Sequence, residues 1–125
     1  MTGFLIVFVG GGIGAALRHG VNLLCARLLG LTFPWGTLIE NVTGSLAMGL
    51  VAGYFAFKAG ASQHLRLFIA TGILGGYTTF SAFSLDTVLL YERGQMWLAA
   101  LYVLASVAFA VGGLLAGMAL VRHLS

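Results

Sequence analysis

Residues 75–84, GGYTTFSAFS, hold the densest group of side chains that could bind an ion. Phe80 and Phe83 stand three residues apart, so on a helix they share one face, and an aromatic ring presents a positive edge to a small anion. Ser81 and Ser84 add hydroxyl donors beside the rings. Rings at this spacing are also typical of an ordinary helix core, and that alternative stays open. Neutral donors and ring edges suit an anion path, because they hold no charge that would trap the ion.

Further polar side chains fall inside apolar stretches elsewhere in the chain. Asn41 lies midway along the second stretch, and Tyr102 and Ser106 lie four residues apart on one face of the fourth. Arg18 lies inside the first stretch, where an ionisable residue is a functional candidate. We expect Arg18 either to anchor the structure or to add positive potential to an anion vestibule.

Membrane-spanning helices must position these side chains. The 125 residues are 60% hydrophobic and 7% charged, with a mean hydropathy of +1.05, so too few charges are present to coat a water-soluble monomer. A spanning helix needs about 20 mostly apolar residues. We predict an all-α membrane protein in which residues 1–125 form a single four-helix transmembrane domain. Its spans are 4–27, 36–57, 65–90 and 96–121.

Composition also excludes other classes of protein. A net charge of +3 is too thinly spread for a nucleic-acid partner. One cysteine allows no intrachain disulfide, and the three histidines show no metal-ligand spacing. The run GGGIGA at 10–15 mimics a dinucleotide-binding fingerprint, but it lies in a membrane span and not after a strand. The amino terminus has no basic region before its apolar run, so we expect no signal peptide.

The third stretch, 65–90, has its midpoint at Tyr77 and Thr78, next to paired glycines and two β-branched threonines. Such residues are poor helix formers, and we predict that this helix breaks near the bilayer centre. Carbonyls freed there must be buried in protein or occupied by an ion. If two antiparallel copies meet, the breaks converge and their carbonyls could hold a cation such as sodium. A kinked packing helix stabilised by hydroxyl back-bonding is the alternative.

Basic residues give almost no orientation signal. The side with the termini holds three, and the opposite side holds two, or three if the intramembrane arginine is counted. We therefore expect insertion in both orientations and an antiparallel homodimer, with a single orientation as the alternative. The residues are Lys58, Arg66 and Arg122 against Arg27 and Arg93, with Arg18.

Each span also contains two small residues four positions apart. Such pairs let helix backbones approach closely in lipid, where burial of apolar surface drives no association. We predict a tightly packed bundle from Gly10/Gly14, Gly49/Gly53, Gly72/Gly76 and Gly113/Gly117.

Four short motifs occur in order: LR at 17–18, GTL at 36–38 before Asn41, GS at 44–45 and GGYTTFSAFS at 75–84. With these motifs the chain resembles, over essentially its whole length, the small bacterial fluoride channels of the Fluc/CrcB family. The resemblance implies a multi-pass protein of the bacterial inner membrane that is not an enzyme. It implies an antiparallel dual-topology dimer with two pores, each lined by both subunits, for passive export of cytoplasmic fluoride.

The resemblance also implies roles for individual residues. Arg18 matches a first-span arginine and would contribute vestibule electrostatics. The main-chain carbonyls of Gly75 and Thr78 match those that hold a structural sodium ion between the two subunits. The fluoride pore would be lined by Asn41, Phe80, Ser81, Phe83, Tyr102 and Ser106.

Two positions depart from the family pattern, and a third position fits it. Ala82 replaces a common Ser or Thr, and Glu40 replaces a small or apolar residue. Asp86 fits an acidic position that is frequent in the family, or it is simply a residue near the membrane exit. An ionised Glu40 would repel fluoride unless it is protonated, paired with an arginine or turned away from the pore. It is also a candidate for a proton-linked or gating group.

Another function class remains open from the sequence alone. The small multidrug exporters are four-span, dual-topology proteins in which one membrane glutamate exchanges protons for a cationic compound. Glu40 would be that group here. The exporters carry the glutamate in the first span, however, and this first span has no acidic residue.

Overall fold

The computed structural model describes residues 1–57, 60 and 62–124, and it is helical along most of that length. Lys58, counted above among the basic residues, lies outside the described residues. No strand occurs in the described ranges. The elements are α1 (Thr2–Leu29), α2 (Trp35–Phe57), α3 (Gln63–Arg66), η1 (Leu67–Leu74), α4 (Gly75–Tyr77), α5 (Phe80–Glu92) and α6 (Met96–Leu124).

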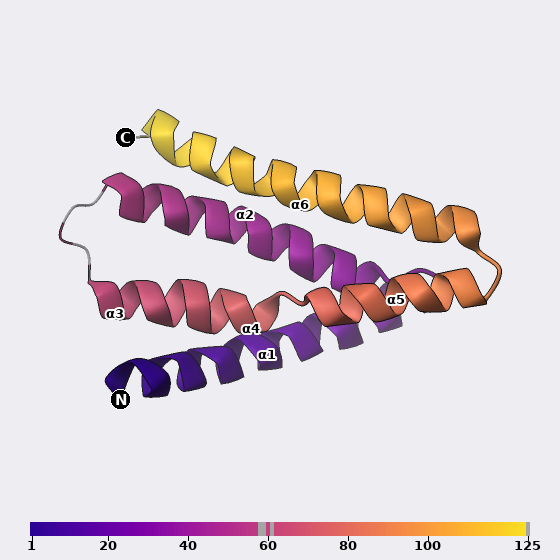
Figure 1. Ribbon diagram of the computed structural model, residues 1–125, viewed down its shortest axis with the longest axis horizontal. Helices are drawn as coiled ribbons and strands as arrows, with labels where there is room; N and C mark the ends of the chain where they lie inside the picture. The colour runs from indigo at the N-terminus through magenta and orange to yellow at the C-terminus, as the bar shows by residue number, and fades with distance from the viewer. Residues whose placement is uncertain (58–59, 61, 125) are drawn as a thin grey trace.

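Four of the helical stretches are long and apolar enough to cross a membrane, which confirms the prediction of four such helices. Most of their ends lie beyond the predicted limits, because helical hydrogen bonding continues past the apolar run into polar residues such as Gln63 and Glu92. Figure 1 shows the two chain ends and the start of α3 at one end of the bundle. The four stretches are Thr2–Leu29, Trp35–Ala56, Gln63–Glu92 and Met96–Leu124.

Two connections turn on glycines with a left-handed backbone. Gly30 follows α1 with φ of 84°, and Gly94 lies between α5 and α6 with φ of 79°. Side chains rarely adopt that conformation, whereas glycine adopts it without strain. Both turns lie at the end of the bundle opposite the termini, as Figure 1 shows, so α1 returns directly into α2 and α5 into α6.

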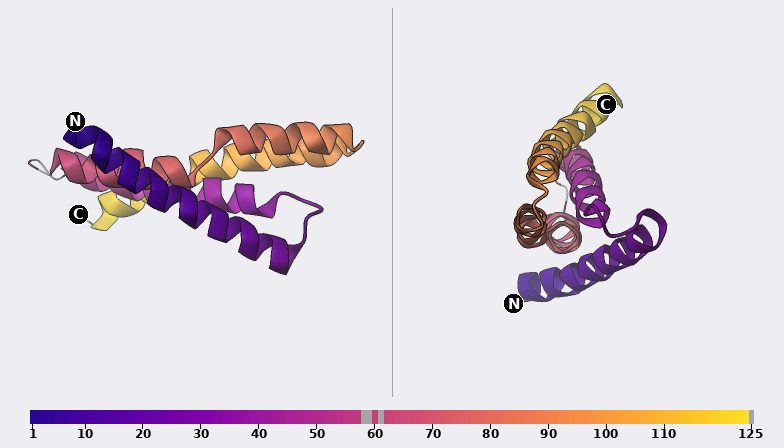
Figure 2. Two further views of the ribbon diagram at one scale, coloured as in Figure 1. Left: turned by 90° about the horizontal axis from the view of Figure 1, so that it is seen from below. Right: turned by 90° about the vertical axis from the view of Figure 1, so that its right-hand side faces the viewer.

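The helices pair in two layers of close contact. In Figures 1 and 2, α2 runs beside α6, while α1 crosses η1 and α4. A Cβ added to Gly117 would lie 2.5 Å from the Leu46 carbonyl oxygen, and one added to Gly10 would lie 2.7 Å from the Phe68 carbonyl oxygen. These contacts confirm the prediction that glycine pairs allow close backbone packing.

One element was not predicted from the sequence. Leu67–Leu74 forms a π-helix, and the Gly75 N–H closes it by bonding to the Ala70 carbonyl five residues earlier. Helices of this kind are rare and occur often at functional sites. Here the π-helix leads directly into α4.

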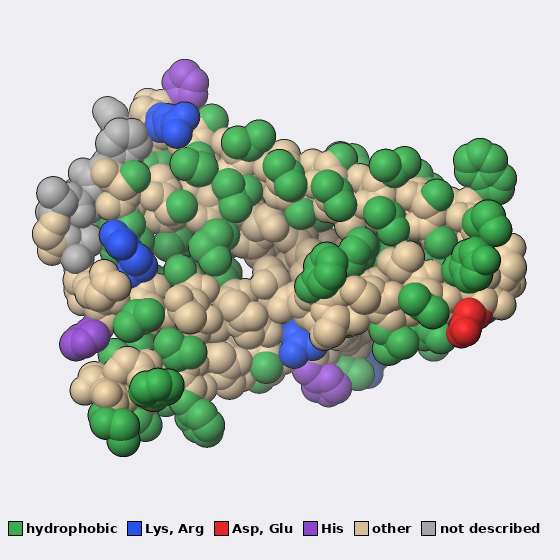
Figure 3. Space-filling view, in the orientation of Figure 1, with side chains coloured by type: hydrophobic (Ala, Val, Ile, Leu, Met, Phe, Trp, Pro, Cys, Tyr) green, Lys and Arg blue, Asp and Glu red, His purple; other side chains and the backbone are tan. Residues whose placement is uncertain are grey.

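The surface agrees with burial in lipid. Figure 3 shows hydrophobic side chains spread along the whole length of the visible face, with few charged ones among them. Large apolar side chains such as Trp97, which is 89% exposed, lie open on the outside. The buried core is small and centres on Leu90, Ala99 and Tyr102, between the ends of α5 and α6.

Candidate functional site

The backbone leaves the helical conformation between α4 and α5. Thr78 has φ of −87° and ψ of 157°, and Thr79 has φ of −152° and ψ of 121°, so both residues are extended. The Thr78 hydroxyl donates to the Leu74 carbonyl at 2.9 Å. The Thr79 hydroxyl accepts from the Ala82 N–H at 3.1 Å and so caps the start of α5. The two threonines thus terminate one helix and begin the next.

Asn41 holds this extended segment from α2. Its Nδ2 donates to the Thr79 carbonyl at 3.0 Å, and its Oδ1 accepts from the Thr79 N–H at 2.8 Å. Both backbone groups of one residue are therefore satisfied by one side chain. At membrane depth no water is available to replace such bonds, so we infer that Asn41 fixes the path of the chain here.

Two carbonyls lose their helical donors at this point. In a continuous helix the Thr79 N–H would bond to the Gly75 carbonyl, but it bonds to Asn41. The Ala82 N–H would bond to the Thr78 carbonyl, but it bonds to the Thr79 hydroxyl. The freed Gly75 and Thr78 carbonyls are hard oxygen ligands, and they therefore fit a small cation by the chemistry of their donor set.

Arg18 binds near the same segment from α1. Its Nε donates to the Gly76 carbonyl at 3.1 Å, and the side chain is half-buried. This contact shows an anchoring interaction for Arg18. Gly44 of α2 gives the segment room, because a Cβ there would overlap the Thr78 methyl group and lie 3.2 Å from Tyr77 Cδ2.

A groove of about 360 Å³ runs along the extended segment between α2, α5 and α6. The Phe80 and Phe83 rings lie in it with their centroids 5.5 Å apart, and Phe80 is 78% exposed. Hydroxyl and amide groups lie beside the rings, from Asn41 and from Ser106. Among the described residues that line the groove, none is charged.

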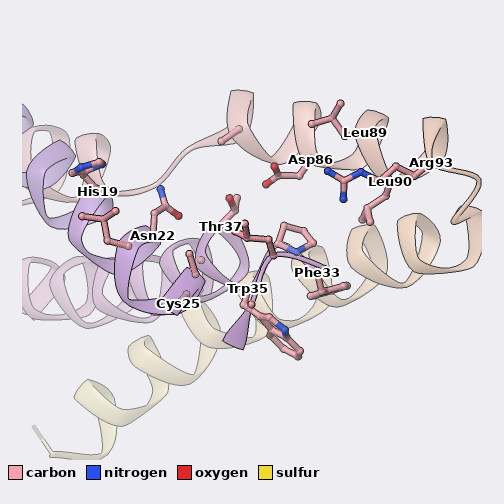
Figure 4. A pocket seen from close by; sticks show the side chains of 17 residues that line it. His19, Asn22, Cys25, Phe33, Trp35, Thr37, Asp86, Leu89, Leu90 and Arg93 are labelled. Atoms are coloured by element: carbon pink, nitrogen blue, oxygen red, sulfur yellow. The ribbon is translucent and has the colours of Figure 1, made fainter. Parts of the chain in front are cut away.

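A second cavity of about 510 Å³ opens near the turns at the far end of the bundle. Figure 4 shows Asn22 of α1, Thr37 of α2 and Asp86 of α5 around it, with Arg93 nearby. Unlike the groove, this cavity therefore carries charged side chains of both signs. Asp86 also accepts a hydrogen bond from the Tyr102 hydroxyl at 3.1 Å.

Phe83 and Tyr102 lie between the cavity and the groove. Their ring centroids are 5.2 Å apart, and Tyr102 has no exposed surface. Phe83 lines the groove, while the Tyr102 hydroxyl reaches Asp86 at the cavity. These two rings, called the aromatic layer below, thus connect the lining of the groove with a residue that lines the cavity.

The predicted site residues are therefore only partly gathered together. Asn41, Thr78, Phe80, Phe83 and Ser106 share the groove. Other predicted residues lie apart. Arg18 is at the Gly76 carbonyl, and Asp86 lines the cavity. Glu40 and Tyr102 are fully buried and line neither space. Ser81 is exposed, with its hydroxyl 3.3 Å from the Thr79 hydroxyl.

Residues 5–118 match the family described as CrcB-like protein, Camphor Resistance (CrcB). The chain belongs to the CrcB family. A relative from Nitrobacter hamburgensis, fluoride-specific ion channel FluC 2, is 65% identical over 122 residues, which cover 98% of each chain. The fluoride-specific ion channel FluC of Rhodopseudomonas palustris strain BisB5 is 65% identical over 122 residues with the same coverage. The FluC of Granulibacter bethesdensis is 60% identical over 125 residues, 99% of this chain and 98% of its own.

The stretch that matches the CrcB family contains both spaces and the extended segment. It also contains residues that the sequence interpretation did not select. Thr79 supplies the backbone groups that Asn41 binds, and Asn22 and Thr37 line the cavity. Thr79 had a signal in the sequence, because it directly precedes α5 and threonine is a preferred residue at a helix N-cap. Asn22 had none, because its neighbours come from distant parts of the chain.

Proposed function

We propose that this CrcB-family protein is a fluoride-selective channel through which cytoplasmic fluoride leaves a bacterial cell passively across the inner membrane. The observation that carries the proposal is the groove, in which neutral donors and aromatic rings are gathered and none of the described lining residues is charged. Close relatives that match this chain over nearly their full length are named fluoride-specific ion channels, and these names support the same function. No covalent chemistry is required, so the protein acts as a channel and not as an enzyme.

The route would lead from the charged cavity across the aromatic layer into the groove. Fluoride holds its water tightly, so a pore must replace that hydration with donors and still let the ion leave. Asn22 and Thr37 offer donors at the cavity, and Ser106 offers a hydroxyl in the groove. The edges of the Phe80 and Phe83 rings, which line the groove, add weak positive contacts for the ion. Such weak sites in series favour conduction over trapping.

We also propose that two copies assemble antiparallel. The groove is open in the single chain, and Phe80 is largely exposed beside it, so a second copy would close it. The last turns of α3 and α6 carry Arg66 and Arg122 at the end with the termini, while Arg27 in the last turn of α1 and Arg93 at the end of α5 lie at the other. That balance supports insertion in both orientations.

Dual topology is tested by labelling a single cysteine from one side of the membrane. Thr32 is exposed in the loop between α1 and α2, so a Thr32→Cys variant made with Cys25→Ser presents one reactive thiol. In intact cells with a permeable outer membrane, an impermeant maleimide should label about half of the protein, because half of the copies present that loop outside. Labelling of all copies or of none would contradict dual topology.

A broken third span and a sodium ion complete the proposal. The extended pair Thr78 and Thr79 lies midway along the apolar stretch Gln63–Glu92, near the expected bilayer centre. In an antiparallel pair the two breaks would meet, and the freed carbonyls of Gly75 and Thr78 in each copy would hold the ion. The ion would supply positive charge that stabilises carbonyls without helical donors.

The phenylalanine rings should contribute directly to conduction. We expect Phe83→Ile to lower fluoride flux by about two- to tenfold, since an aromatic contact contributes about 0.5–1.5 kcal/mol, and Phe80→Ile to act in the same direction. Flux is measured as fluoride release from proteoliposomes. Phe109→Ile is the matched control, because Phe109 is 63% exposed on α6 and does not line the groove. Equal flux in all three variants would remove the rings from the pathway.

The function is tested in cells that lack a fluoride exporter of their own. Expression of this chain should restore growth in medium with fluoride and should leave sensitivity to cationic dyes unchanged. The opposite result, resistance to dyes without resistance to fluoride, would favour a proton-coupled exporter that uses Glu40. An inactive protein in both assays would contradict the channel proposal as well.

A further inference from the structure

Of the three acidic residues, all of which the structure describes, Glu40 alone has no exposed surface. Neither carboxyl oxygen has a hydrogen-bond partner within the described structure, and the same holds for the Ser106 hydroxyl, whose residue is 6% exposed. Buried polar groups in proteins are almost always hydrogen-bonded. An orphaned carboxyl therefore calls for a partner that the protein alone does not supply.

Its position on α2 lies between the two spaces of the proposed pathway. Thr37, three residues earlier, lines the cavity, and Gly44, four residues later, lines the groove. Residues at these spacings share one face of a helix, so Glu40 is placed between them along that face. Tyr102, the buried ring between the same two spaces, lies within electrostatic reach of Glu40.

The groups that face Glu40 from the neighbouring elements do not donate to it. Arg18 of α1 and Asp86 of α5 lie close enough to interact electrostatically with the Glu40 carboxyl group. The Arg18 Nε, however, donates to the Gly76 carbonyl. The Tyr102 hydroxyl of α6 donates to Asp86. The π-helix η1 has no titratable residue, and the Tyr77 hydroxyl of α4 pairs with Thr43.

These surroundings favour the neutral acid. An ionised carboxylate without donors costs several kcal/mol to bury, whereas a neutral carboxylic acid costs far less. The neutral acid carries an O–H that still needs an acceptor. At this point of the pathway the proposed passing ion is itself a strong acceptor.

We propose that Glu40 is a neutral carboxylic acid whose O–H donates a hydrogen bond to fluoride as the ion crosses from the cavity to the groove. The proposal rests on the fluoride function proposed above and names a specificity-determining residue for it. The proton stays on Glu40, because hydrogen fluoride is a stronger acid than a carboxylic acid. Hydrogen bonds to a charged partner are the stronger ones, and the larger chloride ion accepts them less well, so this contact favours fluoride.

Ser106 offers the next hydrogen-bond donor to the ion on the groove side. Its hydroxyl is unpartnered, lines the groove and lies one helical turn from Tyr102 on α6. An ion that leaves Glu40 would meet this hydroxyl next. The two orphaned groups thus become successive donors to one ion.

The test compares fluoride release by the parent, Glu40→Gln and Glu40→Leu between about pH 6 and about pH 9, corrected for leakage of hydrogen fluoride in protein-free liposomes. Parent flux should fall as the pH rises, because an ionised Glu40 loses its donor and repels the ion. Glu40→Gln keeps a neutral donor, so its flux should match the parent at low pH and decline less. Glu40→Leu should lose about tenfold or more at low pH, where the parent still has its charge-assisted donor.

The difference between the pH profiles of the parent and Glu40→Gln measures the effect of Glu40 ionisation on fluoride flux, because titration of Asp86 or Tyr102 would change both profiles. Superimposed profiles, or parent-like flux in Glu40→Leu, would overturn the proposal while leaving the channel function intact. If Glu40→Leu does not assemble, the Glu40→Gln comparison still decides. A parent that releases no fluoride would refute the channel function and this proposal together.

Discussion

Replacing Gly14 with alanine is expected to destabilise the protein more than any other single methyl addition on α1. The new Cβ would overlap the Ile73 carbonyl oxygen and lie 2.8 Å from the Tyr77 backbone nitrogen. Neither atom belongs to a flexible side chain, so α1 and the η1–α4 segment must move apart. Overpacking of this kind costs about 1–3 kcal/mol of stability. Because the new contacts are with main-chain atoms, we expect a cost at the upper end of that range.

Gly12→Ala is the matched control on the same helix. A Cβ on Gly12 meets nothing within 4 Å, and alanine favours a helix over glycine by about 1 kcal/mol, so this variant should be as stable as the parent or more stable. Both are compared by the temperature at which detergent-purified protein loses its assembled state. Equal melting of Gly14→Ala and Gly12→Ala would contradict the close packing of α1 on η1 and α4.

Replacing Asn41 with leucine should have the second large effect. It removes both bonds to Thr79 and leaves an N–H and a carbonyl without partners, at about 1–3 kcal/mol each. The extended segment between α4 and α5 would then lose its fixed path. We expect a lower melting temperature together with loss of most fluoride flux, because Phe80 and Phe83 follow directly after the segment.

Thr43→Val serves as the control for Asn41, two residues further along α2. Thr43 bonds to its own helix and to the Tyr77 hydroxyl, and the latter contact is exposed. Its loss should change flux and melting only slightly. Similar losses in Thr43→Val and Asn41→Leu would show that any polar change on α2 is damaging, and that the Asn41–Thr79 contact has no special part.

Local composition was enough to predict the helices and their close packing. Apolar length alone indicates four spans, and the glycine spacing predicts contacts such as that of Gly117 with Leu46. The π-helix Leu67–Leu74 has no comparable signal, because its apolar residues are compatible with an ordinary α-helix. Its geometry depends on how α1 packs against it.

The site was predictable in its residues but not in its connections. Asn41 and the threonines stand out as polar residues in apolar stretches, yet their pairing joins positions 38 residues apart. Arg18 likewise has a partner, the Gly76 carbonyl, that no spacing in the sequence indicates. The sequence left the surroundings of Glu40 open, because its complete burial without a partner depends on how α1, α5 and α6 pack against α2.

Passive fluoride release from liposomes containing the purified protein tests the central claim most directly. Liposomes loaded with equal fluoride and chloride are diluted into medium without either ion, a potassium ionophore prevents charge build-up, and ion-selective electrodes follow both anions. The account predicts rapid release of fluoride, with chloride retained as in protein-free liposomes, and without any pH gradient or added compound. Release of both anions at the same rate, or fluoride release no faster than from protein-free liposomes, would contradict it.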